Sequence, residues 1–200
     1  MDKKKILKEI KNWALMIFVA LFLATLLNSK VFAKVIVQQS SMENTLFSNQ
    51  HLIEDELSYQ FKEPQKGDII IFYKNEDKGT IFTDIHRNVD NFIARLKKED
   101  SEIHERLVKR VIGVAGDEVD IKAGYVYING VKLEEPYAVG ETLAGVFTLP
   151  ITVGENQLFV LGDNRIVSVD SRTFGLVDLK QIEGKAIFRV FPFSEMGKLN

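Results

Sequence analysis

Cysteine is absent from this 200-residue sequence. Its absence excludes a cysteine nucleophile, a thiolate zinc site, a disulfide scaffold and a lipid-modified N-terminal cysteine. Histidine is scarce, with only His51, His86 and His104. The formal net charge is -2, so the chain lacks the overall basic field that is typical of nucleic-acid-binding proteins, and no nucleic-acid partner is expected.

Uninterrupted apolar sequence is confined to one stretch near the N-terminus. Five lysines and two acidic residues precede the run from Trp13 to Leu27, in which only Thr25 is polar. At about 1.5 Å per residue the run covers roughly 22 Å, and flanking Lys11 and Lys30 can extend it across a bilayer core of about 30 Å. We predict that residues 1–30 form a basic cytoplasmic end and a single transmembrane anchor. The lysines would stay in the cytoplasm and place the rest of the chain outside it.

The same segment is also typical of a cleavable secretory signal. A basic start, a long apolar run and small residues at Val31 and Ala33 would allow cleavage after Ala33. In that case a soluble β protein would be released. N-terminal sequencing of the mature chain distinguishes the two.

Short apolar or β-branched runs, separated by turn residues, fill most of the remaining chain. They lie at 31–38, 50–57, 64–74, 107–121, 124–133, 156–165 and 184–193. Asn129-Gly130 between alternating apolar residues is a strong hairpin signal. Residues 84–105 instead show helical spacing among many charges. We predict a mainly β domain over 31–200, with a helical insertion at 84–105.

Two adjacent serines, Ser40 and Ser41, stand in "QQSSMENTL", and a serine nucleophile needs a base. No aspartate pattern singles out a histidine, and no GxSxG elbow occurs. Lys109, inside the apolar run "ERLVKRVIGV", is the other candidate. Burial would lower its pKa from about 10.4 towards about 8, although a strand lysine commonly points to solvent.

A third segment, "GDNRIVSVDSRTFG" at 162–175, follows the apolar strand "LFVL". It gathers acidic, basic and hydroxyl side chains in one loop, and loops on rigid strands often carry functional sites. A plain turn with exposed ion pairs is the simpler interpretation of this segment alone.

Four segments together resemble type I signal peptidases, the membrane-bound Ser/Lys endopeptidases that remove signal peptides from exported proteins. They are "SMENTL" at 41–46, "GDIIIF" at 67–72, "KRVIGVAGD" at 109–117 and "GDNRIVSVDSRTFG" at 162–175. The resemblance implies coiled antiparallel sheets after one transmembrane helix, with 118–156 as a reduced cap. It implies no metal or organic cofactor. It implies exported preproteins with their signal peptides, and the lipid bilayer, as partners.

The resemblance also assigns roles to residues. It makes Ser41 the nucleophile, Lys109 its base and Ser168 the hydroxyl that positions the lysine. Structural support would come from Asp163, Arg110, Asp170 and Arg172. The substrate-binding residues would be Val35, Val37, Gln39, Met42, Leu46 and Val108, with pockets for small side chains formed by the apolar ones.

Two positions depart from the family pattern. Gln39 stands where a glycine or serine is usual, and its amide could donate to the oxyanion or its bulk narrow the cleft. Asn44 stands where proline is usual, which would loosen the turn that carries Ser41. These departures suggest a specialised paralogue, for example one linked to pilus or other surface-assembly machinery.

Two further functions compete with an active peptidase. A non-catalytic homologue would bind assembly subunits as a chaperone-like factor, and retention of both Ser41 and Lys109 argues against it. A self-cleaving repressor of the related Ser/Lys fold would need an N-terminal DNA-binding domain, for which residues 1–30 leave no room.

Overall fold

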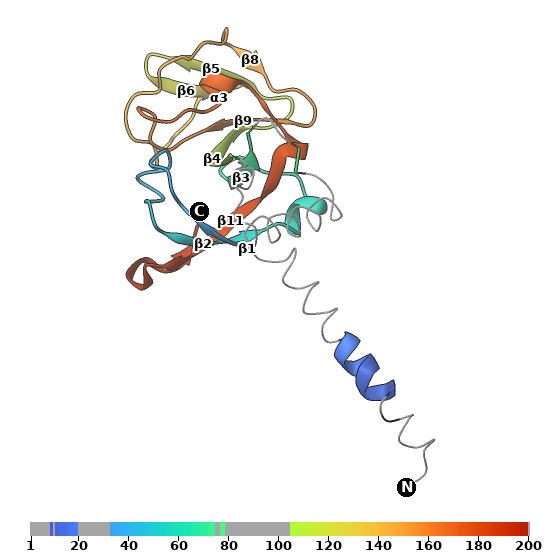
Figure 1. Cartoon of the computed structure of the whole chain (residues 1–200). Coiled ribbons are helices and arrows are strands. Elements are labelled where there is room, and N and C mark those ends of the chain that lie inside the picture. The colour runs from blue at the N-terminus through green and yellow to red at the C-terminus, as the bar shows by residue number, and fades with distance from the viewer. Residues whose placement is uncertain (1–8, 10, 20–32, 75–76, 79–104, 200) are drawn as a thin grey trace, which may run out of the picture.

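The computed structural model describes residues 9, 11–19, 33–74, 77–78 and 105–199. Within these ranges the chain forms two antiparallel sheets with few helical turns. Figure 1 shows the smaller sheet above the larger one, with the described N-terminal helical residues extending below. The prediction of a mainly β domain is therefore confirmed.

The large sheet runs, in spatial order, from β1 at one edge to β10 at the other. Its strands are β1 (Ala33–Ile36), β2 (His51–Asp55), β11 (Ile182–Phe191), β3 (Ile69–Tyr73), β4 (Arg106–Gly113), β9 (Gln157–Leu161) and β10 (Val177–Asp178), with β12 (Gly197–Lys198) paired to β11. Among the described residues β1 is an edge strand, and no strand pairs with its outer side.

The small sheet is formed by the four strands that lie between β4 and β9 in the sequence. Their order is β7 (Val131–Lys132), β6 (Tyr125–Ile128), β5 (Glu118–Lys122) and β8 (Ile151–Thr152). Short helical turns complete the described elements: η1 (Ser58–Gln60), α3 (Ser171–Phe174), η2 (Leu179–Gln181) and η3 (Phe193–Glu195).

Each apolar segment predicted as β contains at least one strand. The hairpin signal is confirmed as well, because Asn129 and Gly130 join β6 to β7 with positive φ angles of 51° and 78°. Strands β8, β10 and β12 were not predicted. Each has two residues, too few to show a periodic pattern, so pairing partners alone define them.

The predicted anchor and insertion lie mostly outside the described residues. Residues 11–19 are helical, and 1–8, 10 and 20–30 are not described. No helix within the described ranges combines the length and apolar character needed to cross a bilayer. Residues 84–104 of the predicted helical insertion also fall outside them.

Strand β3 is the centre of the fold, since all five of its residues are buried. Ile69 and Ile71 pack into one core cluster, whereas Ile70 and Phe72 pack into a second. The alternation places apolar side chains on both faces of the large sheet. A third cluster joins the two sheets, with Ile112 of β4 packed among residues of the small sheet.

A cluster of ionisable side chains lies where β2, β4 and β11 approach one another. Glu54 is fully buried, and its Oε2 lies 3.4 Å from Nη2 of Arg106. Arg106 Nε lies 2.7 Å from Glu183, whose other oxygen accepts a 2.9 Å hydrogen bond from Tyr73. Burial, and then the charge of Glu183, raise the pKa of Glu54 to about 9. Glu54 is therefore protonated at neutral pH.

Glu54 makes stability depend on pH. Its folded-state pKa is about 9 and its ordinary value is 4.5, so the folded protein holds a proton that the unfolded chain releases between these values. The free energy of unfolding should fall as pH rises from 5 to 8, by up to about 1.4 kcal/mol per pH unit. Glu54→Gln should flatten this dependence in urea unfolding curves. Parallel pH profiles for the two proteins would contradict the assignment.

Candidate active site

Ser41 lies in a tight turn that follows β1. The backbone N–H groups of Thr45 and Leu46 donate to the Met42 carbonyl at 2.9 and 2.7 Å. The Met42 and Leu46 side chains are buried in the first core cluster. Asn44 is part of this turn. The two backbone hydrogen bonds and the buried side chains of Met42 and Leu46 hold the turn in place although it lacks proline.

Lys109 reaches this turn from the middle of β4. Its side chain is 1% exposed, and Nζ lies 2.7 Å from Ser41 Oγ. Nζ also donates to the Val108 carbonyl at 3.1 Å. The structure thus joins two residues 68 positions apart into a buried hydroxyl–amine pair. This geometry places the hydroxyl of Ser41 next to the lysine amine, as a serine nucleophile with a lysine base would require.

Burial decides the protonation of this amine. It lowers the pKa of Lys109 from 10.5 to about 8, while the carboxylates of Asp170 and Glu105 act in the opposite direction. A few per cent or more of the amine is therefore neutral near pH 7, and about half of it at pH 8. A neutral amine next to a hydroxyl can act as a general base.

Gly162, whose role no sequence motif indicated, brings the loop 162–175 against the turn that carries Ser41. A Cβ there would lie 2.2 Å from Ser168 Oγ and 2.4 Å from the Ser41 carbonyl oxygen, so no other residue fits. Asn164 N–H donates to that same carbonyl at 3.0 Å. Ser168 Oγ is buried and has no hydrogen-bond partner among the described residues. Its predicted contact with Lys109 stays a prediction.

Asp163 and Arg110 form a buried ion pair beside the turn. Arg110 donates through Nε and Nη2 to the two carboxylate oxygens at 2.9 and 2.8 Å, and the Thr45 hydroxyl also donates to Asp163. The guanidinium lies 4.0 Å from the ring centre of Tyr137. A two-pronged pair of this kind fixes orientation as well as distance, and here it connects β4, the loop and the Ser41 turn.

Asp170 and Arg172 form a second pair inside the loop. Nε and Nη2 of Arg172 each donate to Asp170 at 2.8 Å, and Nη2 also donates to the Arg165 carbonyl at 2.9 Å. Asp170 further accepts the Gly162 N–H at 3.1 Å. The pair therefore folds the loop back on the end of β9.

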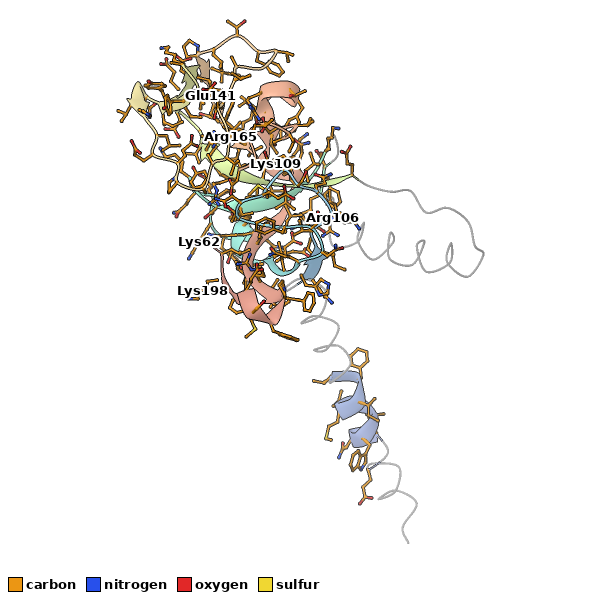
Figure 2. The ribbon with its side chains drawn as sticks, turned by 90° about the vertical axis from the view of Figure 1, so that its left-hand side faces the viewer. Lys62, Arg106, Lys109, Glu141, Arg165 and Lys198 are labelled. Atoms are coloured by element: carbon orange, nitrogen blue, oxygen red, sulfur yellow. The ribbon has the colours of Figure 1, made fainter. Side chains whose placement is uncertain are left out.

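Arg165 connects the loop 162–175 to the segment that joins β7 to β8 in the small sheet. No sequence pattern indicated this role. Its guanidinium donates to the Gly162 carbonyl at 3.0 Å, to Glu135 and to Thr142. Figure 2 places Arg165 between Lys109 and Glu141. An isolated bridge between Val139 and Asn164 continues this connection.

A cleft of about 350 Å³ opens beside Ser41, between β1 and the start of β4. Five of the predicted substrate-binding residues line it: Val35, Val37, Gln39, Met42 and Val108. Leu46, the sixth, lies fully buried in the core beneath the turn. Its place explains why the position is apolar, and it does not line this cleft.

Breaking the Arg110–Asp163 pair should be costly because both partners are buried. Arg110→Leu would leave an unpaired carboxylate and lower the free energy of unfolding by about 3–5 kcal/mol in urea titrations. Adding Asp163→Asn should restore part of the loss. Equal stability of the single variant and the wild type would show that the pair is not a structural support.

Comparisons with known proteins agree on one family. The family model for signal peptidase, peptidase S26, matches residues 10–191. Signal peptidase I of Bacillus caldolyticus is 37% identical over 89% of this chain and 90% of its own length. Signal peptidase IB of Staphylococcus aureus (strain COL) is 31% identical over 94% and 93%.

Among solved structures, a signal peptidase I from Enterococcus faecalis V583 is 32% identical, with a TM-score of 0.41, and the match covers 62% of this chain and 97% of that one. The family-model match and the curated relatives extend over most of the chain. The chain therefore belongs to the peptidase S26 family of signal peptidases.

Proposed function

We propose that this chain is a serine endopeptidase that cleaves signal peptides from exported preproteins after a small-x-small motif, with Ser41 and Lys109 as its catalytic pair. The 2.7 Å approach of a buried lysine amine to a serine hydroxyl carries the proposal. Membership of the signal peptidase family supports the substrate class.

In the first half-reaction, neutral Lys109 accepts the Ser41 proton as Oγ attacks the scissile carbonyl carbon. The tetrahedral intermediate collapses, the C–N bond breaks, and the lysine ammonium protonates the departing amine. An acyl-enzyme on Ser41 remains. Lys109 is then neutral again and takes a proton from water as the water oxygen attacks the ester carbonyl. The second tetrahedral intermediate collapses, the C–O bond to Ser41 breaks, and the ammonium returns its proton to Ser41 Oγ as the signal peptide leaves.

Charge on the intermediate needs a donor in a fixed position. The Ser41 backbone N–H points to no acceptor among the hydrogen bonds of the described residues, which leaves it available for the oxyanion. Gln39 lines the cleft two residues earlier, and we assign its side-chain amide as a second donor.

The buried ion pairs of the 162–175 loop and β4 hold the reacting groups in position. Asp163 with Arg110, and Asp170 with Arg172, act as supports, and Ser168 would hydrogen-bond the amine of Lys109. The apolar cleft residues Val35, Val37, Met42 and Val108 leave room for small side chains before the scissile bond. These four side chains carry no charge, so the pockets that they form select by size.

The same proposal includes a membrane topology. The apolar run from Trp13 to Leu27 would anchor the chain once, with the lysine-rich start in the cytoplasm and residues 31–200 as the extracytoplasmic peptidase domain. This arrangement would present the cleft to preproteins emerging through the same bilayer.

The first test is cleavage of a preprotein with an Ala-x-Ala site by the full-length protein in detergent. Product masses should place the cut after the second alanine. Ser41→Ala and Lys109→Met should each reduce the rate by at least about a thousandfold, because each removes half of the reacting pair. Undiminished cleavage by either folded variant would rule out the Ser/Lys mechanism.

The pH profile tests the role of the amine independently. Since the neutral form of Lys109 is the base and its pKa is about 8, kcat/KM should rise with pH and reach half its maximum near pH 8. Below that, the rate should fall about tenfold per pH unit. Lys109→Arg should be inactive at every pH, because guanidinium stays protonated. A midpoint near 6.5 would indicate a histidine base instead.

Gln39 provides a third test. If its amide donates to the oxyanion, Gln39→Ala should lower kcat by about a hundredfold, and Gln39→Ser should retain more activity than Gln39→Ala. Steady-state kinetics on one small-x-small peptide would decide this. Faster turnover by Gln39→Gly would instead mean that the side chain only narrows the cleft.

The link to a surface-assembly system stays a hypothesis that began with Gln39 and Asn44. Mass spectrometry of exported proteins after deletion of the gene should show unprocessed precursors for a small set of proteins. General failure of signal-peptide processing would contradict it.

A further inference from the structure

The cleft changes character along its length. Near Ser41 it is lined by apolar side chains, among them Val37, Met42 and Val108. At the other end its lining includes three charged residues, Lys34 of β1 and the adjacent Glu105 and Arg106 at the start of β4. A peptide in this cleft therefore meets small apolar pockets first and charged groups further along.

Distances along the strands show which substrate residue meets these charges. Arg106 precedes Lys109 by three residues, and Lys34 precedes Val37 by three. At about 3.3 Å per residue, Arg106 lies roughly 10 Å along the chain from Lys109, and Lys34 lies the same distance from the apolar cleft residue Val37. In Figure 2, Arg106 and Lys109 are labelled at separate places along this part of the fold. An extended substrate would bring its fourth or fifth residue before the scissile bond to them.

Arg106 is fixed at this end by the buried cluster behind it. An ion pair to Glu183 at 2.7 Å and a hydrogen bond donated to Glu54 at 3.4 Å hold the guanidinium, while 39% of the side chain remains exposed. Guanidinium carries five N–H donors, more than these contacts use. A held, half-exposed cation is better prepared to bind an anion than a free surface side chain, because less side-chain entropy is lost.

The balance of charge at this end is positive. Glu105 is 53% exposed and pairs with Lys74 at 3.1 Å, so its carboxylate is already matched. Behind Arg106, Lys78 pairs with Glu56 at 3.7 Å and donates to the Glu183 carbonyl. Glu54 holds a proton at neutral pH, because burial and Glu183 raise its pKa to about 9. Lys34 adds another cation, with no ion pair among the described residues.

We infer that Lys34 and Arg106 form a subsite that favours an acidic side chain at the fourth or fifth residue before the scissile bond. The inference rests on the proposed signal-peptide cleavage and adds charge selectivity to the size selectivity of the apolar pockets. Attraction between partly exposed opposite charges gives only a modest preference for one substrate over another, and that preference weakens as the salt concentration rises.

The test uses peptides with an Ala-x-Ala site that differ only at the fourth or the fifth position, with Asp, Asn or Lys there. At low salt, the wild type should cleave the Asp peptide with a kcat/KM about threefold above the Asn peptide, and the Lys peptide should be poorest. Arg106→Gln and Lys34→Gln should each bring the Asp/Asn ratio towards one. Glu105→Gln is the matched control, since removing the neighbouring negative charge should raise the ratio.

The outcomes separate this inference from the function on which it rests. If the folded wild type cleaves none of the peptides, the proposed function fails. If it cleaves the Asn peptide but all enzymes share one Asp/Asn ratio, or the Lys peptide is preferred, only the charged subsite is wrong. Should Arg106→Gln not fold, the opposite shifts expected for Lys34→Gln and Glu105→Gln still decide the question.

Discussion

The burial of one lysine amine against one serine hydroxyl is the constraint around which this protein is arranged. An ammonium ion in an apolar sheet is disfavoured, and lowering the pKa of Lys109 to about 8 corresponds to roughly 3 kcal/mol of lost preference for the charged form. The fold tolerates this cost because β3 and β4 are buried for other reasons. In the proposed mechanism, activation of Ser41 would thus be a consequence of core packing.

Keeping the amine neutral also requires that nearby carboxylates be neutralised. Asp163 and Asp170 are fully buried close to the pair, and each is matched by an arginine through two hydrogen bonds. Asp170 already raises the pKa of Lys109, and without Arg172 its unpaired carboxylate would favour the charged ammonium form further. The loop 162–175 therefore has an electrostatic role as well as a positional one. Its close approach to the Ser41 turn depends on Gly162, where a side chain would collide with both.

In the cluster around Glu54, burial raises a pKa, whereas at Lys109 it lowers one. Around Glu54, carboxylates approach each other closely, and the proton stays on the buried acid instead of leaving a base free. One fold thus lowers the pKa of a base and raises that of an acid through the same desolvation. In the proposed mechanism, the first effect would serve the reacting end of the cleft. The second leaves the positive charge of Arg106 less compensated at the distant end, about three residues away along β4.

Much of the fold and part of the site can be predicted from local sequence. Runs such as "IIIFY" predict the strands with five or more residues, because burial of a strand requires apolar side chains at every position or every second one. The hairpin at Asn129-Gly130 is equally local, since few residues adopt positive φ. Ser41, Lys109 and the 162–175 loop are recognisable as motifs, although periodicity alone favoured a lysine that faces solvent.

Tertiary structure supplied what no local pattern contains. Only the pairing of β3 with β4 and the seating of Met42 in the core bring Ser41 Oγ to 2.7 Å from Lys109 Nζ, across 68 residues. Gly162, Arg165 and Thr45 acquire their roles from neighbours distant in sequence, as do the two-residue strands. Leu46 reads as a pocket residue yet lies in the core. The physical reason is common to all: burial and hydrogen bonding depend on which surfaces meet, and a linear pattern shows only which surfaces are apolar.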